Sequence, residues 1–258
     1  MGVFVFATSL IPQTYVFEKS GDAESQNMKT GSDKWKELII NSARELNIDI
    51  SPEQAELFAL HADLLIKWNQ KINLTGITDP LEIAIKHFID SIIPLPFIPK
   101  NRRVLDIGSG GGFPGIPLKV LLHSTFFTLI DSSRKKNSFQ KHVIRRLNIK
   151  KIEAFHVRAE DLSKQPTSAN KYNVIICRAL TGLDKFILMA APLIAKKGRI
   201  IAMKGKPDST EIESVKSILK TEPHRLGFNH DHFCLKVKKY TLPYIKAKRS
   251  LLTLDLTI

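Results

Sequence analysis

A glycine-rich turn between an apolar run and a helix start constrains this chain more than any other feature. Residues 104–118 read VLDIGSGGGFPGIPL, so an apolar run with one acid meets four glycines and then a proline-punctuated helix start. Glycines let the backbone turn without a side chain and let a ligand lie directly on the main chain. The following helix directs unsatisfied N–H groups at the same place. The pattern predicts a strand that ends at a nucleotide-like ligand.

From residue 102 onward, apolar runs alternate with stretches of helical periodicity. The predicted strands are residues 104–107, 126–130, 152–157, 174–177 and 199–203. The predicted helices are residues 116–123, 134–147, 184–195 and 211–219. This alternation predicts an α/β fold with a mostly parallel, doubly wound, Rossmann-like sheet that binds its ligand at the C-terminal ends of the strands. Two last runs, 233–240 and 251–258, have no helix between them and predict an antiparallel C-terminal hairpin on one sheet edge.

A helical segment precedes the alternating region. Ser32 is suited to cap a first helix, residues 51–54 (SPEQ) form a capping box for a second, and Asp79 begins a third. Three prolines then mark a boundary at residues 94–99. The expected division is a disordered tail over 1–31, with Met28 as an alternative start, an N-terminal helical segment over 32–95, and the main domain over 96–258.

The charge of the chain is strongly positive and unevenly distributed. Lys and Arg outnumber Asp and Glu by 39 to 25, which gives a formal net charge of +14. Residues 134–151 contain eight basic side chains and no acid, and residues 196–206 and 236–249 are further acid-free basic runs. Such an excess indicates a polyanionic partner, and nucleic acid is favoured because no basic amphipathic helix carries large exposed apolar residues. A solvated basic surface is the alternative.

Cysteine content and hydropathy exclude several other classes. Cys177 and Cys234 form no CxxC pair, which argues against a zinc or other structural metal site and against a disulfide framework. No apolar run approaches the roughly 18 residues needed to span a bilayer. The apolar residues 3–11 lack the basic start of a signal peptide, because the first Lys is Lys19. We therefore expect a cytoplasmic protein with reduced thiols and no membrane partner, acting as a monomer.

The register of the glycines decides which ligand the turn suits. A dinucleotide-type GxGxxG is present at Gly110, Gly112 and Gly115, but its first glycine does not directly follow the strand. Gly108 does directly follow the strand, and counting from it gives GxGxG followed by Phe113. This register argues against a dinucleotide site.

Two acidic positions beyond the turn complete a candidate adenosine site. Asp131 ends the second predicted strand, nineteen residues after Gly112, where a carboxylate can accept both ribose hydroxyls. Capping of the next helix is the alternative role of Asp131. Glu160 lies in the segment 158–161 after the third strand, where an adenine ring would lie. A place in an exposed turn is its alternative role.

These residues resemble class I S-adenosylmethionine-dependent methyltransferases, in which a glycine loop, a ribose acid and an adenine-side acid occur in this order. The flanking segments, from about residue 35 to residue 255, resemble the RsmG family more specifically. This family is also called glucose-inhibited division protein B. The matching segments are Lys67-Trp68-Asn69, Asn73-Leu74-Thr75, Asp79-Pro80, Lys86-His87-Phe88-Ile89-Asp90-Ser91, GFPGIPL, Leu129-Ile130-Asp131-Ser132, Arg158-Ala159-Glu160, Arg178-Ala179 and Met203-Lys204-Gly205.

The resemblance implies a small-subunit (16S) ribosomal RNA methyltransferase that modifies guanine at N7 and uses S-adenosyl-L-methionine as its cofactor. Its partner would be 16S rRNA or the small ribosomal subunit. In that family, Gly108, Phe113, Ala159, Glu160 and Arg178 occupy cofactor-contacting positions. The full candidate cofactor site is Gly108, Gly110, Gly112, Phe113, Asp131, Ala159, Glu160 and Arg178.

The chain departs from the family pattern in three places. The tail before Met28 has no recognisable counterpart, and residue 113 is Phe where Leu also occurs. Residues 245–249 differ from the usual turn before the last strand. This third difference concerns substrate contacts rather than the cofactor site.

The implied reaction needs no acid–base pair. Guanine N7 carries a free lone pair at neutral pH and the sulfonium is an activated donor, so in-line positioning is enough, and we name no catalytic residue. Cys177 follows two isoleucines and is expected to be a buried strand cysteine rather than a nucleophile. His87, Asp90 and Lys204 receive no role.

Two alternatives remain open at this point. One is a class I methyltransferase that acts on another RNA, a protein or a small molecule, and the basic runs disfavour the last two substrates. The other is a non-enzymatic RNA-binding protein that kept the fold. The complete set of Gly108, Asp131 and Glu160 disfavours that second alternative.

Overall fold

The computed structural model describes most of the chain after its first 27 residues. The described residues are 28–165, 168, 171–179, 182–205, 209–221 and 233–256. The tail expected over residues 1–31 therefore lies, up to residue 27, outside the described residues. Its order stays a prediction, as does the division of the chain at residue 95.

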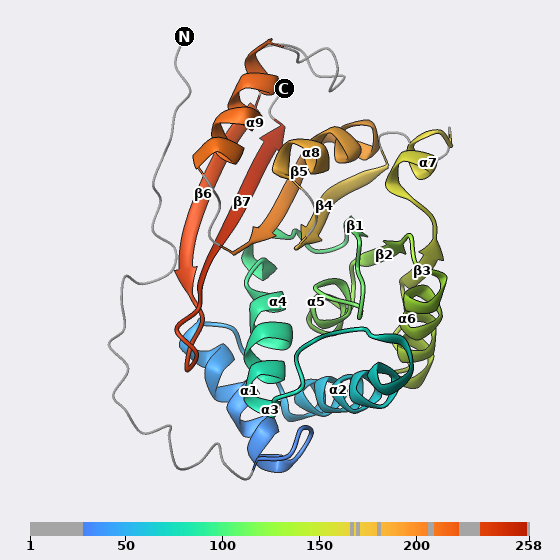
Figure 1. The fold of residues 1–258 in the computed structure, drawn as a ribbon, viewed down its shortest axis with the longest axis vertical. Helices are drawn as coiled ribbons and strands as arrows, with labels where there is room; N and C mark the ends of the chain where they lie inside the picture. Colours follow the sequence, from blue (N-terminus) through green and yellow to red (C-terminus); the bar gives the residue numbers. More distant parts are fainter. Residues whose placement is uncertain are drawn as a thin grey trace.

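In the described part of the chain, seven strands form one sheet (Figure 1). The strands are β1 (Arg103–Ile107), β2 (Phe126–Asp131), β3 (Ile152–His156), β4 (Tyr172–Arg178), β5 (Ile194–Lys204), β6 (Phe233–Thr241) and β7 (Lys248–Leu256). Their order across the sheet is β3-β2-β1-β4-β5-β7-β6. β1 to β5 pair in parallel, and β7 is antiparallel to both β5 and β6. The predicted sheet and its terminal hairpin are confirmed.

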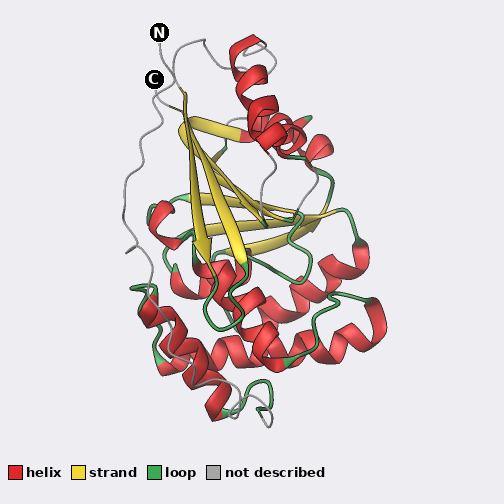
Figure 2. Cartoon of the chain, turned by 60° about the vertical axis from the view of Figure 1, so that its left-hand side comes forward, coloured by secondary structure: helices red, strands yellow, loops and turns green. Residues whose placement is uncertain are grey.

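Two groups of helices cover the two faces of the sheet, as Figure 2 shows. Buried residues of the first group and of one sheet face form one core. That group comprises α1 (Asp33–Glu45), α2 (Pro52–Ile72), the π-helical η2 (Ile83–Ile89), α4 (Asp90–Ile92), α5 (Gly115–Leu121) and α6 (Arg134–Arg146). The second core involves α7 (Ala159–Ser163), α8 (Leu183–Ala190) and α9 (Ser209–Thr221). Two short elements, α3 (Pro80–Glu82) and the 3-10 turn Leu95–Phe97, flank η2 and α4.

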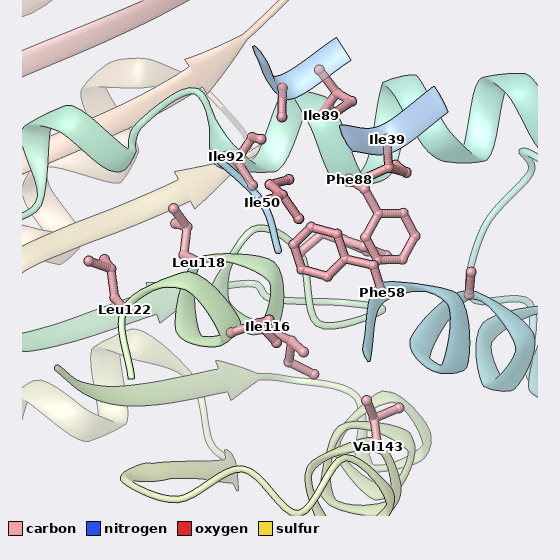
Figure 3. Packing of buried hydrophobic residues seen from close by; sticks show 14 of the residues in the cluster. Ile39, Ile50, Phe58, Phe88, Ile89, Ile92, Ile116, Leu118, Leu122 and Val143 are labelled. Atoms are coloured by element: carbon pink, nitrogen blue, oxygen red, sulfur yellow. The ribbon is translucent and has the colours of Figure 1, made fainter. Parts of the chain in front are cut away.

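Alternation along each strand assigns side chains to the two cores. Val104 belongs to the first core and Leu105 to the second, because successive strand residues point to opposite faces. In the first core, Ile39 of α1, Phe58 of α2 and Phe88 of η2 pack together (Figure 3). The N-terminal helices thus share one continuous core with the sheet and α5.

The helix starts follow the predicted capping. Ser32 accepts a hydrogen bond from the Trp35 amide at 3.4 Å, and Asp79 accepts one from Glu82 at 2.8 Å. Ser51 and Gln54 form the reciprocal capping box of α2. These three starts fix where the N-terminal helices begin and confirm the interpretation of the sequence.

The structure corrects two segments. The helix expected over 184–195 ends at Ala190, and after a 3-10 turn β5 already begins at Ile194, which pairs with Tyr172. Apolar periodicity did not reveal this end, because Ile194 is buried in the same core as the helix. The five-residue α7 was not predicted, since it is too short to show a helical period.

A stack of three rings holds the N-terminal helices against the glycine-rich turn. Phe113 lies between His61 of α2 and His87 of η2, with centroid distances of 4.7 Å to each ring. His61 Nε2 donates to the Gly111 carbonyl at 2.9 Å. His87 Nδ1 accepts from Arg178 at 3.2 Å, because a guanidinium can only donate. The Arg178 donor therefore requires His87 to be neutral at Nδ1.

Burial keeps these histidines neutral far below the usual range. It lowers the pKa of His61 to about 4 and, together with the Arg178 charge, the pKa of His87 to about 3. Protonation of His61 would place a proton on Nδ1, which is buried and has no hydrogen-bond partner among the described residues. Folding of this region thus disfavours protonation of both rings.

We expect the His61→Gln variant to lose less stability on acidification than the wild type. The folded state keeps His61 neutral, whereas the unfolded state protonates it as the pH falls below 6.5, so the wild type loses stability between pH 6.5 and about 4. Between pH 6.5 and about pH 5, His61 contributes about 2 kcal/mol to the loss of unfolding free energy. Urea unfolding at both pH values measures it.

The comparison with the variant isolates the histidine from opposing groups. The carboxyls of Asp90 and Asp106 have raised pKa values, because both are buried, and they favour the folded state on acidification. The exposed His156→Gln variant is the control and should follow the wild type. An equal loss of stability in His61→Gln and wild type would contradict the expectation.

Candidate functional site

The turn after β1 is built from glycines in left-handed conformations. Gly108, Gly110 and Gly112 have φ values of +72°, +55° and +86°, which residues with a Cβ adopt only at a cost. The amides of Gly108 and Ser109 donate to the Ile130 carbonyl at 2.9 and 3.1 Å. The turn is therefore fixed on the end of the neighbouring strand β2.

The fully buried side chain of Asp106 is hydrogen-bonded to residues at both ends of the turn. Asp106 Oδ2 accepts from the Ser109 hydroxyl at 2.7 Å and from the Gly115 amide at 2.8 Å. Its Oδ1 has no partner in the described structure, and burial raises the pKa of Asp106 to about 7. A Cβ at Gly115 would lie 2.7 Å from Oδ2, so only glycine permits this approach. The strand sequence shows this acid but gives no sign of its supporting role.

The carboxylate of Asp131 joins the end of β2 to the turn. Its Oδ2 accepts from the Gly110 amide at 2.9 Å, and its Oδ1 accepts from the Ser133 amide at 2.8 Å. Gln140 of α6 also binds this glycine, because its side-chain amide donates to the Gly110 carbonyl at 2.9 Å. Each oxygen of Asp131 keeps a second lone pair for a further hydroxyl. Gln140 was missed in the sequence, because nothing local distinguishes it from the other polar residues of its helix.

A cleft of about 260 Å³ lies at the C-terminal ends of β1 and β2. Four predicted site residues line it together: Gly108, Asp131, Ala159 and Glu160. They meet because the ends of adjacent parallel strands lie at one edge of a sheet, and α7 follows β3 there. The other lining residues are Ile107, Ile130, Ser132, Val157, Arg158 and Met189. Met189 of α8 carried no signal in the sequence beyond its helical period.

The other four of the eight predicted site residues do not line this cleft. One of them, Gly110, is linked to the cleft by its hydrogen bond to Asp131, and the remaining three lie elsewhere. Gly112 faces the core, since a Cβ there would strike Ile116 and lie 3.4 Å from His61. Phe113 is 5% exposed and lies in the ring stack. Arg178 at the end of β4 is the third. The contacts of these residues with a cofactor stay a prediction.

Arg178 ties the end of β4 to the N-terminal helices. Its Nη1 donates to the Lys86 carbonyl at 2.7 Å, and its guanidinium lies 5.2 Å from the centroid of the Phe113 ring. Asp90 lies 3.7 Å from the same nitrogen and accepts from the Tyr240 hydroxyl at 2.8 Å. Asp90 thus belongs to a buried network that holds three parts of the fold together.

Two further residues without an assigned role are placed by the structure. Lys204, at the end of β5, forms an ion pair with Glu211 of α9. Cys177 is buried, and burial raises the pKa of its thiol well above the usual range, as expected for a strand cysteine that is not a nucleophile.

Among the described residues, no group of His, Cys, Asp or Glu side chains is arranged to bind a metal ion. No helix in the described ranges has both the length and the apolarity to cross a membrane.

Solved structures share this architecture. A putative O-methyltransferase from Klebsiella pneumoniae superimposes with a TM-score of 0.56 at 10% identity, over 87% of this chain and 98% of that one. A SAM-dependent methyltransferase from Aquifex aeolicus gives a TM-score of 0.50 at 16% identity, over 72% and 97%. The chain therefore has the class I SAM-dependent methyltransferase fold.

Sequence relatives are closer. The family described as GidB, rRNA small subunit methyltransferase G, matches residues 54–231. Ribosomal RNA small subunit methyltransferase G of Geobacter sp. (strain M21) is 40% identical over 85% of this chain and 96% of its own length. The protein of the same name from Geotalea uraniireducens is 42% identical over 71% and 83%. The chain belongs to the GidB family of rRNA small subunit methyltransferases G.

Proposed function

We propose that this protein transfers the methyl group of S-adenosyl-L-methionine to N7 of a guanine in 16S ribosomal RNA. The observation that carries the proposal is the cleft in which four predicted site residues meet: Gly108, Asp131, Ala159 and Glu160. The chain also belongs to a family of rRNA methyltransferases. The cleft lies at the C-terminal sheet edge, where open α/β sheets bind their ligands.

The residues of the cleft fit the adenosine part of this cofactor. Asp131 is 7% exposed and held by two backbone amides, so its carboxylate is oriented in advance for the ribose hydroxyls. Glu160 and the backbone at Ala159 face the same cleft and suit the adenine edge. The left-handed turn at Gly108, Gly110 and Gly112 would leave its main chain open to the methionine part.

Phe113 and Arg178 join the glycine turn and the end of β4 to the N-terminal helices. Their packing on His61, His87 and the Lys86 carbonyl fixes the turn and the end of β4 relative to the N-terminal helices. We propose that both position the cofactor-binding turn, whether or not either touches the cofactor itself.

The chemistry requires orientation rather than proton transfer. The bound cofactor supplies a methyl group activated by a sulfonium. With the cofactor bound, the guanine N7 lone pair would form the new N–C bond as the C–S bond breaks, and S-adenosylhomocysteine would leave with that electron pair on sulfur. No proton would have to be removed from N7. The task of the chain is to align acceptor and donor.

The distribution of charge supports an RNA substrate. The basic run 134–151 contains α6, which buries Phe139 and Val143 against the sheet. It exposes basic side chains, including Lys141 and Arg145, to solvent. A basic surface of this kind binds phosphates through counterion release.

We also propose that the protein acts in the cytoplasm as a monomer. The free, buried thiol of Cys177 supports action in this reducing compartment.

Replacement of Asp131 by Asn should weaken cofactor binding at least about tenfold, because a hydrogen bond to a charged group is removed. The Asp161→Asn variant is the matched control, since Asp161 is exposed on α7 and pairs with Lys164. Calorimetric titration with S-adenosylmethionine measures both affinities. RNA affinity and thermal stability, recorded in parallel, separate a weakened cofactor site from unfolding. Equal cofactor affinity of wild type and Asp131→Asn would contradict the proposed site.

Incubation with labelled S-adenosylmethionine should place label in 16S rRNA. Small ribosomal subunits, protein-free 16S rRNA and small subunits already methylated by the enzyme serve as the three substrates. Strand cleavage specific for 7-methylguanine then locates the modified base. Label found only in protein or small molecules, or on another atom of the RNA, would overturn the proposed function.

A further inference from the structure

A second hollow, of about 830 Å³, lies over β2 and β3 and is separate from the cofactor cleft. Phe126 pairs with Arg103, which lies two residues before Leu105 and therefore points to the same sheet face. Phe155 pairs with Ile130, which belongs to the same core as Leu105, so both rings lie on this face. That face is opposite the N-terminal helices. The volume is within the range of about 300–1,000 Å³ that is typical of ligand pockets.

Exposed aromatic rings lie in this hollow. Phe126 and Phe155 are each 45% exposed, and in the described residues only Val237 and Tyr244 are comparably exposed large hydrophobic side chains. Within the described part of the chain, Phe155 has no ring or cation against it. Its face is therefore available for stacking by a planar ligand.

Cations line the hollow, and two of them lie over Phe126. Arg103 and Lys151 lie over Phe126, with the charged groups 5.7 and 5.0 Å from its centroid. Lys141 and Lys171 also line the hollow. Among the described residues, none of these four cations has an ion-pair partner. One carboxylate, that of Glu153, lines the same hollow, so positive charge prevails.

The hollow adjoins the cofactor cleft. Val157 lines both, and α7 supplies Leu162 to the hollow and Glu160 to the cleft. A chain bound in the hollow would therefore run along the β3 edge toward the cleft. The combination of an open ring, unpaired cations and this position fits an unstacked nucleotide of a polyanion.

We propose that this hollow binds a single-stranded segment of the RNA substrate, with one base stacked on Phe155 and phosphates held by Lys141, Lys151 and Lys171. A duplex would not fit this arrangement, because its bases are stacked and do not present a free face. The inference rests on the proposed function, since it takes RNA to be the substrate.

The first test measures binding of a fluorescent single-stranded RNA fragment of 16S rRNA without cofactor. Phe155→Leu keeps the apolar bulk and removes the aromatic face, and it should lower the affinity about tenfold. Phe155→Tyr keeps the face and should bind like the wild type. In methyl transfer, Phe155→Leu should raise KM for RNA and leave kcat and cofactor affinity unchanged. Unchanged RNA binding by Phe155→Leu would overturn the proposal.

The second test concerns the cations. The double variant Lys151→Gln/Lys171→Gln should lower the slope of log affinity against log salt by about 0.7 for each phosphate that the variant no longer binds. Lys67→Gln/Lys216→Gln removes the same charge from lysines paired with Asp63 and Glu213, and it should leave the slope unchanged. Equal slopes in both double variants would overturn the assignment of these lysines to RNA phosphates.

The outcomes also separate this inference from the proposed function. A wild type that binds RNA through Phe155 but methylates no rRNA would support the hollow and overturn the function. A Phe155→Leu variant that loses affinity for small subunits, but not for protein-free RNA, would overturn the RNA assignment in favour of a protein partner.

Discussion

The hydrogen bond from the Gly110 amide to the Asp131 carboxylate is the interaction on which the site depends. It joins the turn after β1 to the end of β2, and parallel pairing brings these two strand ends to the same sheet edge. Bonds from Gly108 and Ser109 to the Ile130 carbonyl fix the same turn on the strand. The cleft is thus shaped by contacts of the chain itself, which means that a ligand need not order it.

A second layer of contacts fixes this turn to the N-terminal helices. Phe113 lies between two neutral imidazoles, and Arg178 spans from β4 to the backbone of η2. Asp106 holds the start of α5 from below. Most of these groups are buried, so their contacts are made within the protein rather than with solvent. The helical segment is therefore part of the support of the site.

Sequence patterns predicted the sheet, the terminal hairpin and the meeting of Gly108, Asp131 and Glu160, and the resemblance to the family added Ala159. They did so because apolar strands alternating with helices imply parallel pairing, and parallel strands end at one edge. The packing of Phe113 was not predictable, since its partners on α2 and η2 are distant in sequence and show no local signal. The hollow beside β3 was also missed, because the exposure of Phe155 depends on which helices cover the sheet.

We propose that S-adenosylmethionine binds in the cleft formed by the glycine turn, Asp131 and α7. The most direct measurement is the change in the amide NMR spectrum of the isotope-labelled protein on adding the cofactor. The largest shifts are expected at Gly108, Gly110, Asp131 and Glu160, with small shifts at Phe155. Shifts concentrated away from the strand ends, with these four amides unmoved, would contradict it.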